Sequence, residues 1–378
     1  VFSIAQATSC EYIALMASNR FPEPAPDGVL RLFGADGSPY SNNVLAVLRY
    51  RRLPHWWLGF NSLEGIGAPN PPGPPLLPKM VFPDGTVMND STFLIKELER
   101  RYPNSRTVIP PNPAIAFLCA LFEDYCDEWV TKAMFHYRWT YDIETAGFGI
   151  GSGGVGLGFA GGIERIREFG EEVAKRQVAR LRDVVGSNDT TGPVIEQSFE
   201  QVCRLLEAHL HAGNAYLFGS RPSAADFALF GQLHPMISLD PETSRRVFNA
   251  SRSVWFWYHS LKDLSGYSLK SQAAGWFEPA SLPRTLLALF AEVGRLYAPF
   301  MLANAAAVAA GQRDFTCTLD GGTVPWQQAS FKYQAKCLSW LREHYGSLAL
   351  ADREVVDRVL AGTGCAAMLR ESLTSSKL

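Results

Sequence analysis

The chain has 378 residues, of which 47% are hydrophobic and 19% are charged, and its formal net charge at pH 7 is −2. This length predicts two to three domains, and the composition excludes a disordered or fibrous protein. Because the charge is balanced and no basic stripe is visible, a nucleic-acid-binding protein is not expected. The seven cysteines are scattered without a CxxC pair, which predicts neither a disulfide framework nor a zinc site and favours a reducing compartment.

The first part of the chain has the pattern of a compact α/β unit at residues 29–103, which follows a proline-rich N-terminal extension at residues 1–28. Periodicity predicts a strand, a helix and a second strand, in that order, at residues 29–33, 42–52 and 55–60. Beyond a proline-rich loop, Pro83-Asp84-Gly85 is a turn sequence that predicts an antiparallel hairpin. A helix follows at residues 91–101, so the predicted order is β-α-β, loop, β-β-α.

From residue 114 onward the pattern is helical and no strand is predicted. Residues 114–266 form a predicted all-α domain, in which apolar residues recur at three- and four-residue spacing over 114–139, 163–185, 195–211 and 224–233. The glycine-rich segment 147–162 carries no charge and is predicted to be mobile. It includes a GxGxxG match at 149–154, which follows a helix rather than a strand and is therefore interpreted as a flexible loop rather than a dinucleotide site.

Residues 282–378 are predicted to be a further helical extension. Three prolines occupy positions where first helical turns are expected, namely Pro283, Pro299 and Pro325. The longest nearly apolar stretch, 298–310, is too short to span a bilayer, so we expect no transmembrane helix. The last three residues, Ser376-Lys377-Leu378, match the tripeptide that peroxisomal import receptors read at a free C-terminus. We expect a soluble intracellular protein, peroxisomal in a eukaryotic cell and cytoplasmic otherwise.

Ser38 lies between the first strand and the first helix, where it is predicted to cap the helix, with Pro39 as the first helical residue. Helix capping is by itself a sufficient explanation for the Ser38-Pro39 pair at this position. The same position also offers exposed backbone N–H groups, the positive end of the helix dipole and a hydroxyl that can donate to a thiolate. A thiol held there would ionise near neutral pH.

Two further positions of this unit could contact a ligand. Pro78 immediately precedes a predicted strand, where a cis X-Pro bond can expose a backbone edge to an extended peptide, although it could also simply end the loop. Asp90 and Ser91 open the last helix of the unit, where they could cap the helix or hold a substrate carboxylate on its N-terminal amides.

The order of these elements resembles the thioredoxin-like N-terminal domain of the glutathione S-transferase superfamily. The motifs that carry the resemblance are Ser38-Pro-Tyr-Ser41, Leu77-Pro78, the Pro-Asp-Gly hairpin and Asp90-Ser91. In the helical domain, Ser223 and Asp226 resemble the buried capping box of the same family. The resemblance covers residues 29–266 and implies an α+β thioredoxin-like domain followed by an all-α domain of the transferase type.

The resemblance implies that glutathione is the co-substrate, that the hydroxyl of Ser38 activates its thiol, and that Tyr40 is a nearby alternative donor. Serine at both 38 and 41 replaces the cysteines of redox relatives, so thiol–disulfide exchange is not expected. The implied reaction is attack of the thiolate on an apolar electrophile. A glutathione-dependent lyase or isomerase, and a non-catalytic module for protein interaction or assembly, stay open as alternatives.

The resemblance also implies how glutathione would be held. The backbone of Leu77, before a cis Pro78, would pair with the cysteinyl part of the tripeptide, and Asp90 and Ser91 would hold its γ-glutamyl end. A homodimer is a further expectation from the family. The proline-rich loop at 61–77, the glycine tract and the extra C-terminal region depart from an ordinary two-domain transferase.

Other clusters are given simpler interpretations. Four acidic residues are expected to form the solvated face of a helix rather than a carboxylate site, namely Glu123, Asp124, Asp127 and Glu128. The aromatic run from Phe135 to Trp139 is expected to pack in the core, or to line a second-substrate pocket if its helix borders the cleft. No HExxH or comparable motif occurs, so no metal site is predicted.

Overall fold

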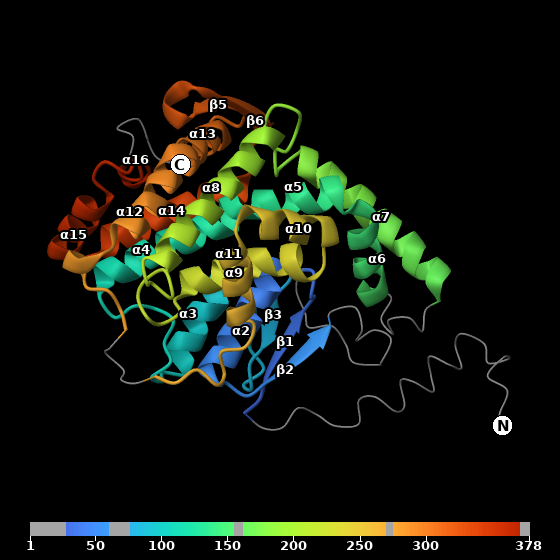
Figure 1. The fold of residues 1–378 in the computed structure, drawn as a ribbon, viewed down its shortest axis with the longest axis horizontal. Coiled ribbons are helices and arrows are strands. Elements are labelled where there is room, and N and C mark those ends of the chain that lie inside the picture. The colour runs from blue at the N-terminus through green and yellow to red at the C-terminus, as the bar shows by residue number, and fades with distance from the viewer. Residues whose placement is uncertain (1–27, 60–75, 155–161, 270–274, 371–378) are drawn as a thin grey trace.

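The computed structural model describes residues 28–59, 76–154, 162–269 and 275–370 (Figure 1). Four predictions lie wholly or partly outside the described residues: the N-terminal extension, nearly all of the proline-rich loop, residues 155–161 of the glycine-rich segment, and the terminal tripeptide Ser376-Lys377-Leu378.

The N-terminal unit is a four-stranded sheet with the order β2-β1-β3-β4. Its elements along the chain are β1 (Leu30–Gly34), α2 (Pro39–Arg51), β2 (His55–Gly59), β3 (Lys79–Val81), β4 (Val87–Asn89) and α3 (Ser91–Arg101). Strand β1 pairs in parallel with β2 and antiparallel with β3, and β3 pairs antiparallel with β4. The predicted β-α-β, β-β-α order is confirmed.

The strand register brings the predicted ligand-contact positions, at Ser38, Pro78 and Asp90-Ser91, to one edge of the sheet. Phe33 near the end of β1 pairs with Lys79 at the start of β3, and Lys79 pairs with Asn89 at the end of β4. Because neighbouring strands lie about 4.8 Å apart, the loop after β1, the residues before β3 and the residues after β4 emerge side by side.

A helical domain follows the sheet (Figure 1). Its elements are α4 (Pro113–Tyr125), a π-helical turn (Cys126–Val130), α5 (Thr131–Tyr141), α6 (Ile143–Gly154), α7 (Ile163–Arg182), α8 (Gly192–His211), α9 (Ala224–Ser238), α10 (Pro241–Ala250) and α11 (Arg252–Leu261). The predicted capping box is present at the start of the buried helix α9. Asp226 Oδ2 accepts from the backbone N–H of Ser223 at 2.8 Å, and Oδ1 accepts from the N–H of Leu217 at 2.9 Å.

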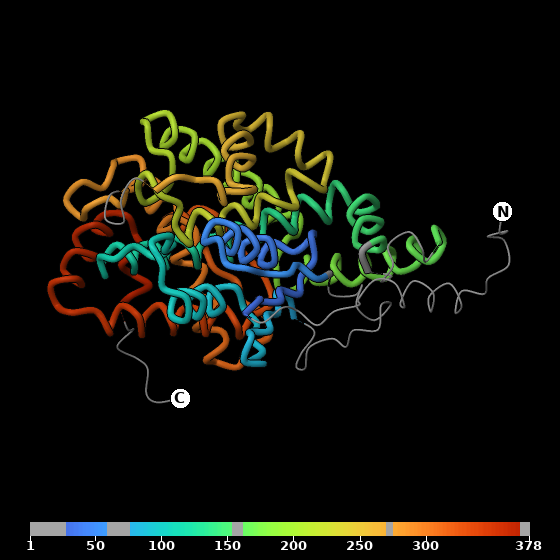
Figure 2. The backbone as a smooth tube through the Cα atoms, turned by 90° about the horizontal axis from the view of Figure 1, so that it is seen from below, coloured from blue at the N-terminus to red at the C-terminus, as the bar shows by residue number. Residues whose placement is uncertain are grey.

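Helices α6 and α7 form a pair that extends away from the C-terminal helices in both views (Figures 1 and 2). The expectation of a loop at 149–154 is wrong, because this glycine-rich sequence forms the second half of α6. Glycine is needed where the two helices meet: a Cβ on Gly147 would lie only 3.0 Å from the carbonyl oxygen of Gly170. The glycines therefore permit close helix packing.

The C-terminal region is not purely helical. It contains α12 (Arg284–Glu292), a π-helical turn (Val293–Tyr297), α13 (Ala298–Ala309), β5 (Asp314–Leu319), β6 (Val324–Ala329), α14 (Lys332–Ser347), α15 (Leu350–Leu360) and α16 (Ala366–Leu369). Pro325, expected at a helix start, lies instead in β6 opposite Thr318. A two-stranded sheet has only edge strands, where a residue without an N–H is tolerated.

The helix from Arg284 to Ala309 is long and apolar enough to cross a membrane by length and composition. However, 56% of its most apolar window is buried inside the protein, which is typical of a core helix. Phe290 and Phe300 on this helix are fully buried, and they belong to one cluster of buried side chains that runs from β1 to α16. The C-terminal region thus shares the core of the two preceding domains.

Candidate functional site

The residues that the sequence predicts for the glutathione site lie at this edge of the sheet, and their conformations are specific. Ser38 caps α2: its Oγ accepts a hydrogen bond from the backbone N–H of Ser41 at 3.3 Å. The Leu77–Pro78 peptide bond is cis. Asp90 precedes α3 with a φ of 79°, which non-glycine residues rarely adopt, and its side chain makes no cap hydrogen bond.

A cavity of about 780 Å³ lies between this sheet edge, the helical domain and α14. Its volume is within the range of small-molecule binding sites. Five of the six predicted site residues line it, namely Tyr40, Leu77, Pro78, Asp90 and Ser91. Ser38 does not line the cavity, because its side chain is directed to the cap of α2.

Tyr40 is tied to the helical domain. Its hydroxyl donates to the carbonyl oxygen of Asp127 at 3.0 Å and lies 3.3 Å from Oγ1 of Thr131. Burial, reinforced by the neighbouring carboxyls of Glu128 and Asp127, raises the pKa of Tyr40 well above its ordinary value. Tyr40 is therefore a hydrogen-bond donor at neutral pH and not a base.

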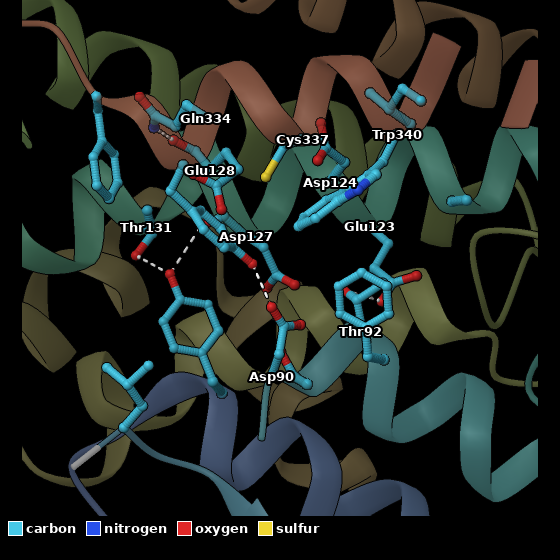
Figure 3. A pocket seen from close by; sticks show the side chains of 18 of the residues that line it. Asp90, Thr92, Glu123, Asp124, Asp127, Glu128, Thr131, Gln334, Cys337 and Trp340 are labelled. Carbon is cyan, nitrogen blue, oxygen red and sulfur yellow. Dashed lines mark hydrogen bonds between the residues drawn. The ribbon is translucent and has the colours of Figure 1, made fainter. Parts of the chain in front are cut away.

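The four acidic residues of α4 and the following π-helical turn line the cavity, so the prediction that they form a solvated face is wrong (Figure 3). Glu123, Asp127 and Glu128 are each more than nine-tenths buried. Periodicity correctly separates the acidic face from the apolar face of this helix. It cannot show that α3 and α14, from distant parts of the chain, cover the acidic face in place of water.

Burial changes the protonation of these four residues, Glu123, Asp124, Asp127 and Glu128, which together form an acidic wall of the cavity. It raises the pKa of Asp124 to about 7, although Tyr297 donates to that carboxyl at 2.5 Å. Burial and the adjacent Asp124 raise the pKa of Glu128 to about 8. The pKa of Asp127 is raised by burial and by neighbouring carboxyls. At neutral pH the wall consequently carries less negative charge than its composition suggests.

Lys132 stands beside the acidic wall and is 1% exposed. Its Nζ donates to the carbonyl oxygen of Val185 at 2.9 Å and to Oε1 of Gln328 at 2.8 Å. Burial lowers the pKa of Lys132 to about 7. Its hydrogen bonds join α5 to β6 and so hold the C-terminal hairpin against the helical domain.

We expect the acidic wall to make stability depend on pH. A carboxyl whose folded-state pKa exceeds its unfolded value near 4 favours folding less as pH rises between those two values. An Asp124→Asn/Glu128→Gln double variant should therefore gain stability relative to the unaltered protein between pH 4 and 7. The gain should be on the order of 1.4 kcal/mol per pH unit for each carboxyl removed.

Urea denaturation of both proteins at several pH values between 4 and 7 measures this difference. The range ends at pH 7 because Lys132, whose pKa is lowered to about 7, acts in the opposite sense above it. A stability difference that stays constant over the range would contradict the assigned protonation.

Sequence reasoning missed the wall of the cavity that α14 supplies. Tyr333 donates from its hydroxyl to Oδ2 of Asp90 at 2.5 Å, and the ring of Trp340 packs edge-on against Phe93 of α3, with centroids 5.0 Å apart. Cys337 also lines the cavity. No local signal could place these residues, because Tyr333 and Asp90 are 243 positions apart. Phe135 lines the cavity as well, as one of its two interpretations allowed.

The loop before Ser38 is fixed by the helical domain. Arg138 of α5 donates from Nη1 to the carbonyl oxygen of Gly37 at 2.8 Å and from Nε to Oδ2 of Asp240 at 2.7 Å. Arg138 and Asp240 are both buried. Within the described ranges, no group of three or more His, Cys, Asp or Glu side chains is placed to hold a metal ion.

A small mixed sheet of this order, followed by an all-helical domain, with a cavity between them and α14, defines a protein with a thioredoxin-like N-terminal domain. Family models match the two domains in the same order. Residues 32–106 match the glutathione S-transferase N-terminal domain, and residues 164–264 match the glutathione S-transferase C-terminal domain. These two regions therefore carry the N-terminal and C-terminal domains of the glutathione S-transferase superfamily, in that order.

Solved structures similar to this chain include three glutathione S-transferases. The enzyme from Methylobacterium radiotolerans, in complex with glutathione sulfonate, is 19% identical with a TM-score of 0.40, covering 68% of this chain and 95% of that one. The enzyme from Ceriporiopsis subvermispora, in complex with glutathione, is 18% identical with a TM-score of 0.40, covering 64% and 100%. The enzyme from Pseudomonas fluorescens is 17% identical with a TM-score of 0.32, covering 61% and 93%. No curated protein matches the sequence.

Proposed function

We propose that the cavity binds glutathione and presents its thiol to an apolar electrophile. The observation that carries this proposal is the meeting of Leu77, Pro78, Asp90 and Ser91 in one cavity between the two domains. An extended peptide can pair with the backbone of Leu77. The carboxylate of Asp90 suits the ammonium of the γ-glutamyl end, and the first N–H groups of α3, from Ser91 on, suit its carboxylate.

In the proposed reaction, the glutathione thiolate attacks the electrophilic carbon, a carbon–sulfur bond forms, and the leaving group departs with the bonding electrons. Ser38 accepts a hydrogen bond from Ser41, so its own hydroxyl proton is available to donate to the thiolate. The positive end of the α2 dipole acts in the same sense. The aromatic side chains of Phe135 and Trp340, which line the cavity, offer apolar contact to the electrophile.

One observation favours the non-catalytic alternative: Ser38 does not line the cavity. A protein-assembly module could bind glutathione without turnover. Activity toward a generic aryl halide distinguishes the two functions, because only an enzyme would lose turnover in Ser38→Ala. Pairing into a homodimer and the peroxisomal address stay predictions from the sequence.

Calorimetric titration with glutathione tests the proposal. We expect binding to the full chain, and we expect Asp90→Asn to weaken it about tenfold or more. A hydrogen bond to a charged group contributes about 1.5–3 kcal/mol, and each 1.4 kcal/mol is a tenfold change in affinity. Asp189→Asn is the matched control, because Asp189 is exposed and does not line the cavity. Absence of binding, or equal affinity of Asp90→Asn and the unaltered chain, would refute the assigned site.

A further inference from the structure

Asp90 does not act as a helix cap, although its position before α3 predicts that role. Its side chain makes no hydrogen bond to α3, and its φ of 79° turns the backbone out of the usual N-cap conformation. Instead the carboxyl reaches α14, where Oδ2 accepts the proton of the Tyr333 hydroxyl at 2.5 Å. The conformation of Asp90 therefore serves its contact with Tyr333 in the cavity and does not serve to cap α3.

Tyr333 is held firmly in place. The N–H of the nearby Phe331 donates to Oδ1 of Asn304 at 2.8 Å, and Nδ2 of Asn304 donates back to the carbonyl oxygen of Phe331 at 3.0 Å. The next residue, Gln334, donates to the carbonyl oxygen of Glu128 at 3.2 Å. The ring of Tyr333 also lies edge-on to Trp340, with centroids 6.0 Å apart. These contacts fix the start of α14 against α13 and, through Glu128, against the helical domain.

The hydrogen bond from Tyr333 orients the carboxylate. It engages Oδ2 of Asp90, and within the described part of the chain Oδ1 has no hydrogen-bond donor. Oδ1 is then the acceptor for one N–H of a primary ammonium, and the lone pairs of the phenol oxygen can accept a second. Burial and the adjacent carboxylate keep the pKa of Tyr333 far above neutral, so the phenol stays a donor.

We propose that Tyr333 of the C-terminal region is a positioning residue for the glutathione site, orienting Asp90 toward the γ-glutamyl ammonium. The inference rests on the proposed function, because it assumes that glutathione occupies the cavity. It assigns α14 a role that neither matched domain supplies, since the domain models end at residue 264. The C-terminal region then completes the ligand site within a single chain.

The test compares two ligands with two tyrosine variants. Tyr333→Phe removes the hydroxyl and keeps the ring that packs against Trp340. Tyr345→Phe is the matched control, because Tyr345 lies on the same helix, donates to Asp357 at 2.7 Å and does not line the cavity. Titrations use glutathione and its analogue without the γ-glutamyl amino group, and thermal melting verifies that each variant folds.

We expect Tyr333→Phe to bind glutathione about three- to tenfold more weakly than the unaltered chain, as loss of one hydrogen bond implies. The deaminated analogue should bind both proteins equally, and Tyr345→Phe should match the unaltered chain. Equal weakening for both ligands would assign Tyr333 a merely structural role, and tighter binding would mean that it competes with the ligand. Either result overturns the inference.

The result for Asp90→Asn separates this inference from the proposed function. If Asp90→Asn weakens glutathione binding and Tyr333→Phe does not, only the role of Tyr333 is refuted. If the unaltered chain does not bind glutathione at all, both proposals fall.

Discussion

Replacing Arg138 with methionine is expected to lower the free energy of unfolding by about 3–5 kcal/mol, the usual cost of removing one partner from a buried ion pair. Arg138 is 4% exposed and donates to Asp240 at 2.7 Å. The side chain of Asp240 is fully buried, so the substitution would leave a carboxyl without its cation. The carbonyl oxygen of Gly37 would lose a hydrogen bond at the same time. Urea denaturation of the purified variant measures the loss.

A double variant is the control for this prediction. Replacing Asp240 with leucine together with Arg138→Met removes both charges, and it should recover a large part of the lost stability. Asp240 makes no cap hydrogen bond to α10, so its removal should not weaken that helix. A loss below about 1 kcal/mol in the single variant, against the 3–5 kcal/mol expected for such pairs, would contradict the role of this ion pair.

Trp326→Ala is expected to cost about 3–5 kcal/mol, as for other fully buried aromatic residues. The indole is 1% exposed, and its ring centroid lies 5.1 Å from that of Trp129 and 5.8 Å from that of Phe300. The hairpin β5–β6 therefore contributes to the same core as α13 and the π-helical turn before α5. Because that core is shared, the variant should lose stability in the whole chain.

Denaturation followed by tryptophan fluorescence and by circular dichroism tests this prediction. Phe256→Ala is the control, because Phe256 is 61% exposed and should change stability by less than about 0.5 kcal/mol. The two signals should change together in Trp326→Ala. A first transition confined to the C-terminal region, with the other domains unaffected, would show that the region is an appendage.

The parts of the fold that could be predicted depend on local chemistry. The turn Pro83-Asp84-Gly85 is a local signal for a hairpin, and in the structure Gly85 has a φ of 83° between the paired strands β3 and β4. Ser223 and Asp226 satisfy each other within a single helical turn, as a capping box requires. The β-α-β, β-β-α order likewise follows from local signals, namely the spacing of apolar residues within each strand and helix. Because this order fixes which strand ends meet, Leu77, Pro78, Asp90 and Ser91 could be predicted to line one site.

The parts that could not be predicted depend on contacts between distant segments. Glu123 and Glu128 have the pattern of a solvent-exposed helix face, and only the positions of α3 and α14 show that they are buried. The hairpin β5–β6, by contrast, has a local signal, because Phe315, Cys317 and Leu319 alternate with polar residues before the turn sequence Asp320-Gly321. Tyr333 reaches Asp90 from another region of the chain, beyond the reach of any local motif.

The most direct test of the central claim is a crystal structure of the full chain grown with glutathione. We expect the tripeptide in the cavity, with its cysteinyl backbone paired to Leu77, its γ-glutamyl ammonium on Asp90 and its sulfur toward the start of α2. Glutathione bound elsewhere, or an empty cavity at saturating glutathione, would refute the proposed function.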